Sequence, residues 1–248
     1  MFYTTIIYTQ KNHIAVLTLN RPEAENIINQ QLAQELKDVC YHINQDYDIY
    51  VVIITGAGDK AFCGGSELEQ RNPDYNVATA IASINQPVIV AINGNARGEG
   101  LELALSGDIR LASFHAKFSL PQVTLGLIPR DGGTQRLSRI IGKAKALELI
   151  LTADTISAVE ALEIGLLNKV VTNENLTSEV EAIAKTIAGK GPIALRYAKE
   201  AVNKGMDLTL EQGLHLEANL YFLLHTTSDR TEGISSFRGK KDPQFKGQ

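Results

Sequence analysis

A glycine-rich turn beside a glutamate is the part of this chain best suited to chemistry. The segment GNARGEGLEL (residues 94–103) follows an apolar strand, turns on glycines and begins a helix. The first N–H groups of that helix have no helical partner and carry the positive end of the helix dipole, so they can hold a developing oxyanion. Glu102 lies about one turn into the helix, close enough to face the same ligand as a general acid or base. The alternative is that Glu102 only stabilises the helix N-terminus.

Two other glycine-rich turns are candidate binding sites. GAGDKA (residues 56–61) follows the apolar run YVVIIT and fits a dinucleotide fingerprint, but no helix follows it and no strand ends in an acid about 20 residues later. The turn Cys63-Gly64-Gly65-Ser66 exposes bare main-chain N–H groups to a ligand. Ser66 lacks the G-x-S-x-G turn of serine hydrolases, which argues against that mechanism.

Composition points to a small-molecule protein. The 248 residues are 44% hydrophobic and 21% charged, as in ordinary globular proteins, and the net charge of −4 offers no basic stripe for nucleic acid or a membrane surface. No apolar run reaches the roughly 18 residues of a membrane span, and the start resembles no signal peptide. The five histidines lie at no metal-ligand spacing, and two cysteines are too few for a disulfide framework. We expect a cytoplasmic protein without a metal site.

The hydrophobic pattern predicts an α/β fold followed by helices. We expect strands at residues 5–9, 13–19, 50–55, 87–92, 108–112, 117–120 and 167–171, and helices near 27–44, 67–85, 98–106 and 144–151. Beyond Asn175 the amphipathic segments 176–188, 193–204 and 209–225 predict helices only. We divide the chain into a core of residues 1–190 and a C-terminal helical region of residues 191–248, whose tail from Ser235 could be a solvated end.

Three longer segments carry a family resemblance. KAFCGGSEL (60–68), AINGNARGEGLELALSGDIRLA (91–112) and FSLPQVTLGLIPRDGGTQRLSRIIG (118–142) resemble the enoyl-CoA hydratase/isomerase family, also called the crotonase family. RPEAENIINQQL, ALELILTADTISAVEALEIGLLNKVV and EGISSFRGKKDPQF resemble further parts of the same pattern. Because the match runs from about residue 5 to 246 with spacing kept, it is specific for the family and less so for the reaction.

The resemblance implies both a fold and a substrate class. It implies a spiral of β-β-α units with a C-terminal helical oligomerisation region, assembled as homotrimers or hexamers. The substrate is then a coenzyme A thioester, with no separate cofactor. By motif position the N–H groups of Ser66 and Glu99 form the oxyanion hole. Substrate-binding positions fall near Ala24 and from Gly65 through Ser66 to Leu68, and Lys241 or its neighbour Lys240 is a candidate phosphate contact, with a solvated tail as the alternative.

Departures from the family pattern bear on mechanism. Family hydratases use two glutamates; one matches Glu102, whereas the other position holds Gln122, which cannot exchange a proton at neutral pH. Asp131 stands where a small or apolar residue is usual, and it could supply the missing acid or pair with Arg130 to shape a loop. Glu99 replaces a usual glycine, and we expect its side chain to point away from the pocket, since only its N–H is required.

These residues favour a one-base reaction at Glu102. The first hypothesis is an acyl-CoA hydratase or dehydratase that stabilises a thioester enolate. An enoyl- or dienoyl-CoA isomerase or an acyl-CoA hydrolase of the same family is the alternative. From other classes, a non-catalytic RNA-binding or scaffold relative stays open, although the charge balance argues against RNA binding.

Overall fold

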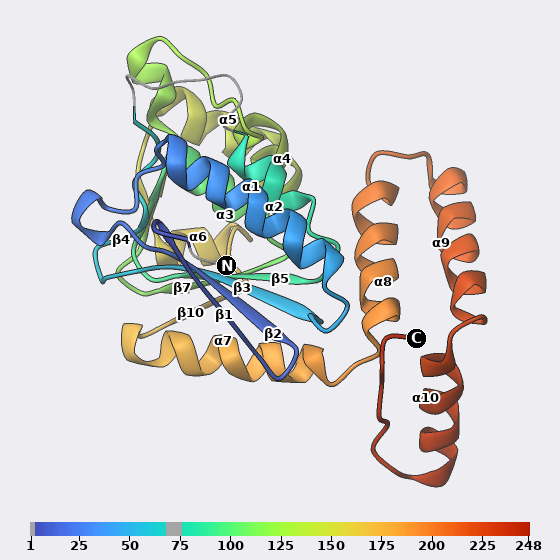
Figure 1. Cartoon of the computed structure of the whole chain (residues 1–248). Helices are drawn as coiled ribbons and strands as arrows, with labels where there is room; N and C mark the ends of the chain where they lie inside the picture. Colours follow the sequence, from blue (N-terminus) through green and yellow to red (C-terminus); the bar gives the residue numbers. More distant parts are fainter. Residues whose placement is uncertain (1–2, 68–75) are drawn as a thin grey trace.

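Two β-sheets form the framework of the computed structural model, which describes residues 3–67 and 76–248 (Figure 1). The first sheet has the order β1-β2-β3-β5-β7-β10, and the second has the order β4-β6-β8-β9. The first contains β1 (Ile6–Lys11), β2 (Ile14–Leu19), β3 (Val51–Gly56), β5 (Val88–Ile92), β7 (Ile109–Ser113) and β10 (Lys169–Val171). The second contains β4 (Ala61–Cys63), β6 (Asn95–Arg97), β8 (Lys117–Ser119) and β9 (Ile156–Ser157).

Successive turns of the chain give one strand to each sheet. Strands β3 and β4 are followed by α2 (Val77–Ala82), and strands β5 and β6 by α3 (Glu99–Leu105). Strands β7 and β8 are followed by α4 (Gly133–Ile141) and α5 (Lys143–Thr152). Within each sheet the strands of these three turns pair in parallel. The expected spiral of β-β-α units is confirmed.

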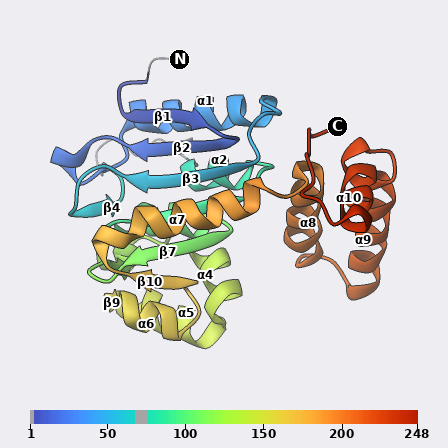
Figure 2. The same cartoon turned by 90° about the horizontal axis from the view of Figure 1, so that it is seen from below.

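Strand β3 shows why its sequence is apolar at nearly every position. Val52 and Ile54 face the main core, which they share with apolar residues of α1 (Gln30–Gln45). Val51 and Ile53 face a second core beneath α7 (Asn173–Ala188), the helix that crosses the outer face of the first sheet in Figure 2. Because alternate side chains of a strand point to opposite faces, a strand covered on both sides is apolar throughout.

Most expected elements are present within a few residues of their predicted bounds. The expected helix near 67–85 is described only as α2, since residues 68–75 lie outside the described residues. Sequence patterning missed three helices: α4, α6 (Ala158–Glu163) and α10 (Ser228–Gly239). Two of them are short, and α10 carries a polar sequence with no clear apolar face.

The C-terminal helices lie to one side of the sheets (Figures 1 and 2). They are α8 (Pro192–Gly205), α9 (Leu210–Leu224) and α10, and among the described helices none is long and apolar enough to cross a membrane. The tail from Ser235 is expected from its sequence to be a solvated end, and this expectation is wrong for Lys246 and Gly247. The buried carboxylate of Asp229 accepts hydrogen bonds from the N–H groups of Lys246 and Gly247, at 2.7 and 2.8 Å.

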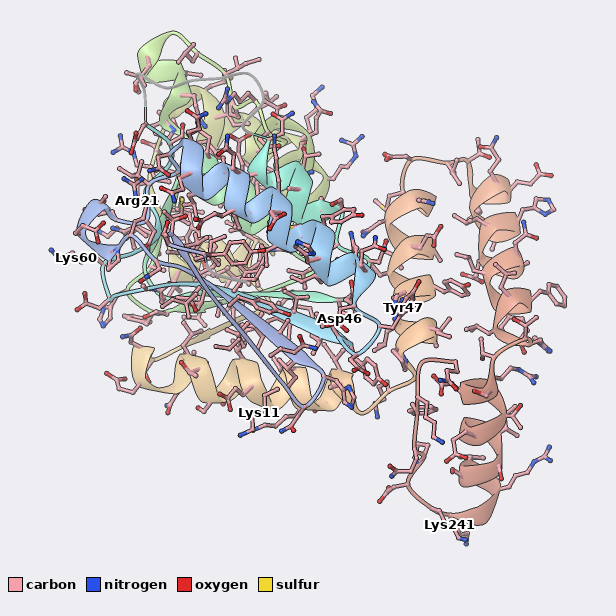
Figure 3. The ribbon with its side chains drawn as sticks, viewed as in Figure 1. Lys11, Arg21, Asp46, Tyr47, Lys60 and Lys241 are labelled. Carbon is pink, nitrogen blue, oxygen red and sulfur yellow. The ribbon has the colours of Figure 1, made fainter. Side chains whose placement is uncertain are left out.

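An ion pair joins the helical region to the sheet. Lys199 Nζ of α8 lies 2.7 Å from Asp108 Oδ2, and it also donates to the Gln86 carbonyl oxygen at 2.9 Å. The side chain of Tyr47, labelled in Figure 3, lies between the core and α8, with the Arg196 guanidinium 5.4 Å from its ring centroid. These contacts set how α8 leaves the core.

Replacing Lys199 by Met should lower the free energy of unfolding by about 2 kcal/mol, because Asp108 then keeps a largely buried carboxylate without its cation. Lys204→Met is the matched control on the same helix, since its pair with Glu200 is exposed and should contribute less than about 0.5 kcal/mol. Chemical denaturation of both variants measures the difference. Equal losses would show that the Lys199 pair does not anchor α8.

Candidate active site

Three turns meet at one edge of the second sheet. Because β4, β6 and β8 run parallel, their carboxyl ends lie at the same edge, with Cys63 opposite Ala96 and Arg97 opposite Ser119. The chain leaves those ends in the turns 64–66, 98–100 and 120–122. The Gly98 N–H donates to the Ser119 carbonyl oxygen at 2.9 Å, which ties the second turn to the third.

Glycines allow the first two turns to touch. A Cβ atom on Gly100 would overlap the main chain of Cys63, so no larger residue fits at that point. Gly65 has a φ of 115°, and a Cβ there would lie 3.3 Å from the Arg97 carbonyl oxygen. The turn that presents Ser66 therefore packs directly on the turn that presents Glu99.

The main-chain N–H groups of Ser66 and Glu99 are free to bind a ligand. Among the described residues, neither group donates a hydrogen bond. Ser66 is fixed from both sides, because Ile28 N–H donates to the Gly65 carbonyl at 2.8 Å and Glu67 N–H donates to the Ile28 carbonyl at 3.0 Å. Glu99 begins α3, where helix geometry offers its N–H no acceptor. These are the two amides that the family resemblance predicts for an oxyanion hole.

Glu102 is fully buried and held by a neighbouring loop. Its Oε1 accepts the N–H groups of Asp131 at 2.7 Å and Gly133 at 2.8 Å, and its Oε2 faces Gln122 Nε2 at 3.4 Å. Burial raises the pKa of Glu102 from 4.5 to about 7, against the opposing effect of the two amides. A carboxyl group that titrates near neutrality can both accept and return a proton.

Gln122 lies beside Glu102, as the sequence predicts. It is 5% exposed and sits in the 3-10 helix Pro121–Leu125 that follows β8. Its Nε2 points to Glu102, whereas its Oε1 is buried and has no hydrogen-bond partner among the described residues. A buried acceptor without a partner is uncommon and suits a site that receives a ligand or water.

The carboxylate of Asp131 serves a helix end. It accepts the N–H groups of Ala78 at 2.6 Å and Thr79 at 3.1 Å, and the Thr79 hydroxyl at 2.7 Å. These donors belong to the first turn of α2, whose N–H groups need acceptors. This arrangement supports the alternative in which Asp131 shapes a loop. The carboxylate binds the first turn of α2, a partner that sequence reasoning missed. Asp131 contributes its main-chain N–H to Glu102.

The other predicted positions fall in different places. Ala24 ends the 3-10 helix Pro22–Ala24, next to Glu25, whose carbonyl accepts the Gly64 N–H at 2.9 Å, so it adjoins the Ser66 turn. Leu68 lies outside the described residues. Lys241 lies at the far end of the C-terminal helices in Figure 3, away from Arg21 and Lys60 on the core. Within one chain, the structure does not bring Lys241 to the other candidates.

The side chain of Glu99 lies against the Ser66 turn. It is 8% exposed, and its Oε2 lies 3.5 Å from the position of a Cβ on Gly65. Sequence reasoning also missed Gly133 as a donor to Glu102, although the pair Gly132-Gly133 marks a main chain able to approach closely.

Comparison with known proteins agrees with this geometry. Residues 9–248 match the family described as enoyl-CoA hydratase/isomerase. The chain is 40% identical to crotonyl-CoA hydratase of Syntrophomonas wolfei, with 99% of each chain covered, and 38% identical to short-chain-enoyl-CoA hydratase of Clostridium acetobutylicum, with 97% of each covered. The solved enoyl-CoA hydratase of Bacillus anthracis is 40% identical, with a TM-score of 0.96 over 99% of this chain and 100% of that one. This chain belongs to the enoyl-CoA hydratase/isomerase family and has its crotonase fold.

Proposed function

We propose that the protein adds water to the double bond of a 2-enoyl-CoA thioester and catalyses the reverse dehydration, with Glu102 as the principal acid and base. The single observation that carries this proposal is the buried Glu102, with a pKa of about 7, in the helix whose first N–H group is free. The hydratase names of the relatives support the choice of water addition within the family.

The proposed hydration passes through a thioester enolate. Glu102 takes a proton from water while the water oxygen bonds to the β-carbon. The π electrons shift toward the thioester carbonyl, and the N–H groups of Ser66 and Glu99 hold the enolate oxygen. The electron pair then returns to the α-carbon, which takes the proton from Glu102. One water molecule is consumed, and Glu102 is again ionised.

Gln122 fits the role of positioning the water. Its Oε1 is a buried acceptor without a partner, and its Nε2 faces the carboxylate that would receive the proton. A water molecule that donates one hydrogen to Glu102 and the other to Gln122 keeps an oxygen lone pair for the β-carbon. An amide can orient the water in this way without exchanging a proton.

The same proposal extends to substrate binding and assembly. We place the coenzyme A arm along the main chain at Ala24 and from Gly65 through Ser66 to Leu68. Large apolar side chains of the C-terminal helices are exposed, including Leu210, Phe222 and Phe237. Residues 191–248 are therefore proposed as the oligomerisation region of a homotrimer or hexamer, in which Lys241 would reach a neighbouring subunit's substrate. We propose a cytoplasmic location.

Glu102→Gln should lower the hydration rate of crotonyl-CoA by about 10³-fold, because the amide cannot accept the proton of water. The loss of ultraviolet absorption by the conjugated thioester measures turnover. Glu179→Gln, on α7 at the outer face of the first sheet, should retain the rate within about threefold, since its exposed ion pair with Lys169 at 2.6 Å lies outside the candidate site. Full activity of the Glu102 variant would refute the assignment, and double-bond migration or thioester cleavage by the wild type would identify the isomerase or hydrolase alternative.

The pH dependence of kcat/KM should report the ionised form of Glu102. As the pH falls through about 7, Glu102 takes up a proton and can no longer accept one from water. We expect kcat/KM to fall about tenfold for each pH unit between 6 and 5. Initial rates from pH 5 to 8, with folding checked by circular dichroism, test this. A flat profile would contradict the role of Glu102.

The raised pKa of Glu102 should reduce stability at high pH. The folded state binds the proton more tightly than the unfolded state, so stabilisation is complete below pH 4.5 and is lost as the pH rises to about 7. At pH 8, Glu102→Gln should therefore be more stable than the wild type by up to about 3 kcal/mol, and this gain should disappear near pH 4.5. Denaturation of both proteins at the two pH values measures it; a difference independent of pH would be inconsistent with burial of an ionising group.

A further inference from the structure

The carboxylate of Glu99 has no hydrogen-bond or ion-pair partner among the described residues. Each of the other buried carboxylates, those of Glu102, Asp131 and Asp229, accepts at least two main-chain N–H groups. Glu99 is 8% exposed. Its oxygens are not among the fully buried polar atoms that lack a partner, so they remain accessible to water or to a ligand.

Glu99 lies within the proposed catalytic site. It precedes Glu102 by three positions on α3, so both side chains share one face of the helix. Its charge contributes to the raised pKa of Glu102, as expected for carboxylates that lie close together. Its Oε2 also approaches Gly65, the residue before the Ser66 N–H. The carboxylate therefore lies close to both free amides.

A carboxylate at this point opposes the proposed chemistry. Negative charge collects on the thioester oxygen during the reaction, and a nearby anion raises the energy of that state. The family resemblance places a glycine here, which avoids the penalty. The Glu99 carboxylate slows the proposed reaction and forms no contact within the described part of the chain that stabilises the fold. Its effect therefore falls on which acyl groups the site binds.

Gln122 provides an independent indication that this surface faces a ligand. Its side chain is more than nine-tenths buried, its Oε1 lacks a partner among the described residues, and its Nε2 lies 3.6 Å from the position of a Cβ on Gly98. The turn before α3 is thus lined by Gln122 on one side and by Glu99 and Glu102 from the helix itself. A ligand bound at this turn therefore lies next to the Gln122 amide oxygen and the two glutamate carboxylates.

We propose that Glu99 determines the charge of the acyl group accepted by this site: uncharged acyl groups bind, and acyl groups that carry a carboxylate are rejected by repulsion. The inference rests on the proposed acyl-CoA function and adds a substrate class to it. Coenzyme A itself is common to both kinds of thioester, so its phosphates do not affect the comparison. Repulsion between charges in a partly desolvated site is large enough to change affinity tenfold.

Binding of two saturated thioesters tests the proposal without requiring turnover. Butyryl-CoA and glutaryl-CoA differ in the carboxylate at the end of the acyl chain. Calorimetric titration of the wild type should give a lower Kd for butyryl-CoA. Glu99→Gln removes the charge at almost constant volume, and it should reduce the ratio of the glutaryl-CoA Kd to the butyryl-CoA Kd by about tenfold or more.

Two further variants complete the design. Glu179→Gln removes one negative charge from α7, on the outer face of the first sheet, and should leave the Kd ratio unchanged, since this partly exposed residue lies outside the proposed site. Glu99→Gly restores the residue usual in the family and should change the Kd ratio in the same way as Glu99→Gln. If one of these variants folds poorly, the other still tests the proposal. An unchanged ratio in both Glu99 variants, or no binding of either thioester to the wild type, would overturn the proposal. Tighter wild-type binding of glutaryl-CoA would also overturn it.

The outcomes separate this inference from the hydratase proposal. A wild type that hydrates crotonyl-CoA through Glu102 but shows no charge discrimination keeps the function and loses the role of Glu99. A wild type that discriminates through Glu99 but does not hydrate crotonyl-CoA keeps the acyl-group selection and loses the proposed reaction.

Discussion

The site depends on a carboxylate kept dry and yet hydrogen-bonded by the main chain. Glu102 receives the N–H groups of Asp131 and Gly133 but no cation among the described residues, so burial dominates and its pKa rises to about 7. A paired arginine or lysine would lower the pKa and leave a weak base at neutral pH. The loop that supplies the two amides is held in turn by α2, through the carboxylate of Asp131. The hydrogen bonding of the Glu102 carboxylate thus depends on the contact between Asp131 and the N-terminus of α2, which belongs to an earlier β-β-α unit.

Parallel pairing of strands in the smaller sheet brings the residues of the candidate site together. Strands β4, β6 and β8 end at one edge, so residues distant in sequence present Ser66, Glu99 and Gln122 to the same space. The close contact of Gly100 with Cys63 sets the separation of the two free amides, since a side chain at Gly100 would force the turns apart.

Local signals made part of this arrangement predictable. Glu102 and the Glu99 amide lie in a short segment where a strand, a glycine turn and a helix start follow one another, whereas the Ser66 amide was predicted only through the family resemblance. Hydrophobic periodicity predicts α1 and β3 within a few residues. Asp131 was ambiguous because its partners, Ala78 and Thr79, lie more than 50 residues earlier. The hydrogen bonds from Lys246 and Gly247 to Asp229, and the approach of the Glu99 side chain to Gly65, are likewise tertiary. Sequence spacing contains no information about such contacts.

Exchange of the α-protons of butyryl-CoA with deuterated water tests the central claim most directly, because it needs only enolate formation and a base. Nuclear magnetic resonance should show deuterium entering the α-carbon in the presence of the wild type and no enzyme-dependent exchange with Glu102→Gln. Equal exchange by both proteins, or none by a wild type that binds the thioester, would contradict the assignment of Glu102 and the two amides to thioester enolisation.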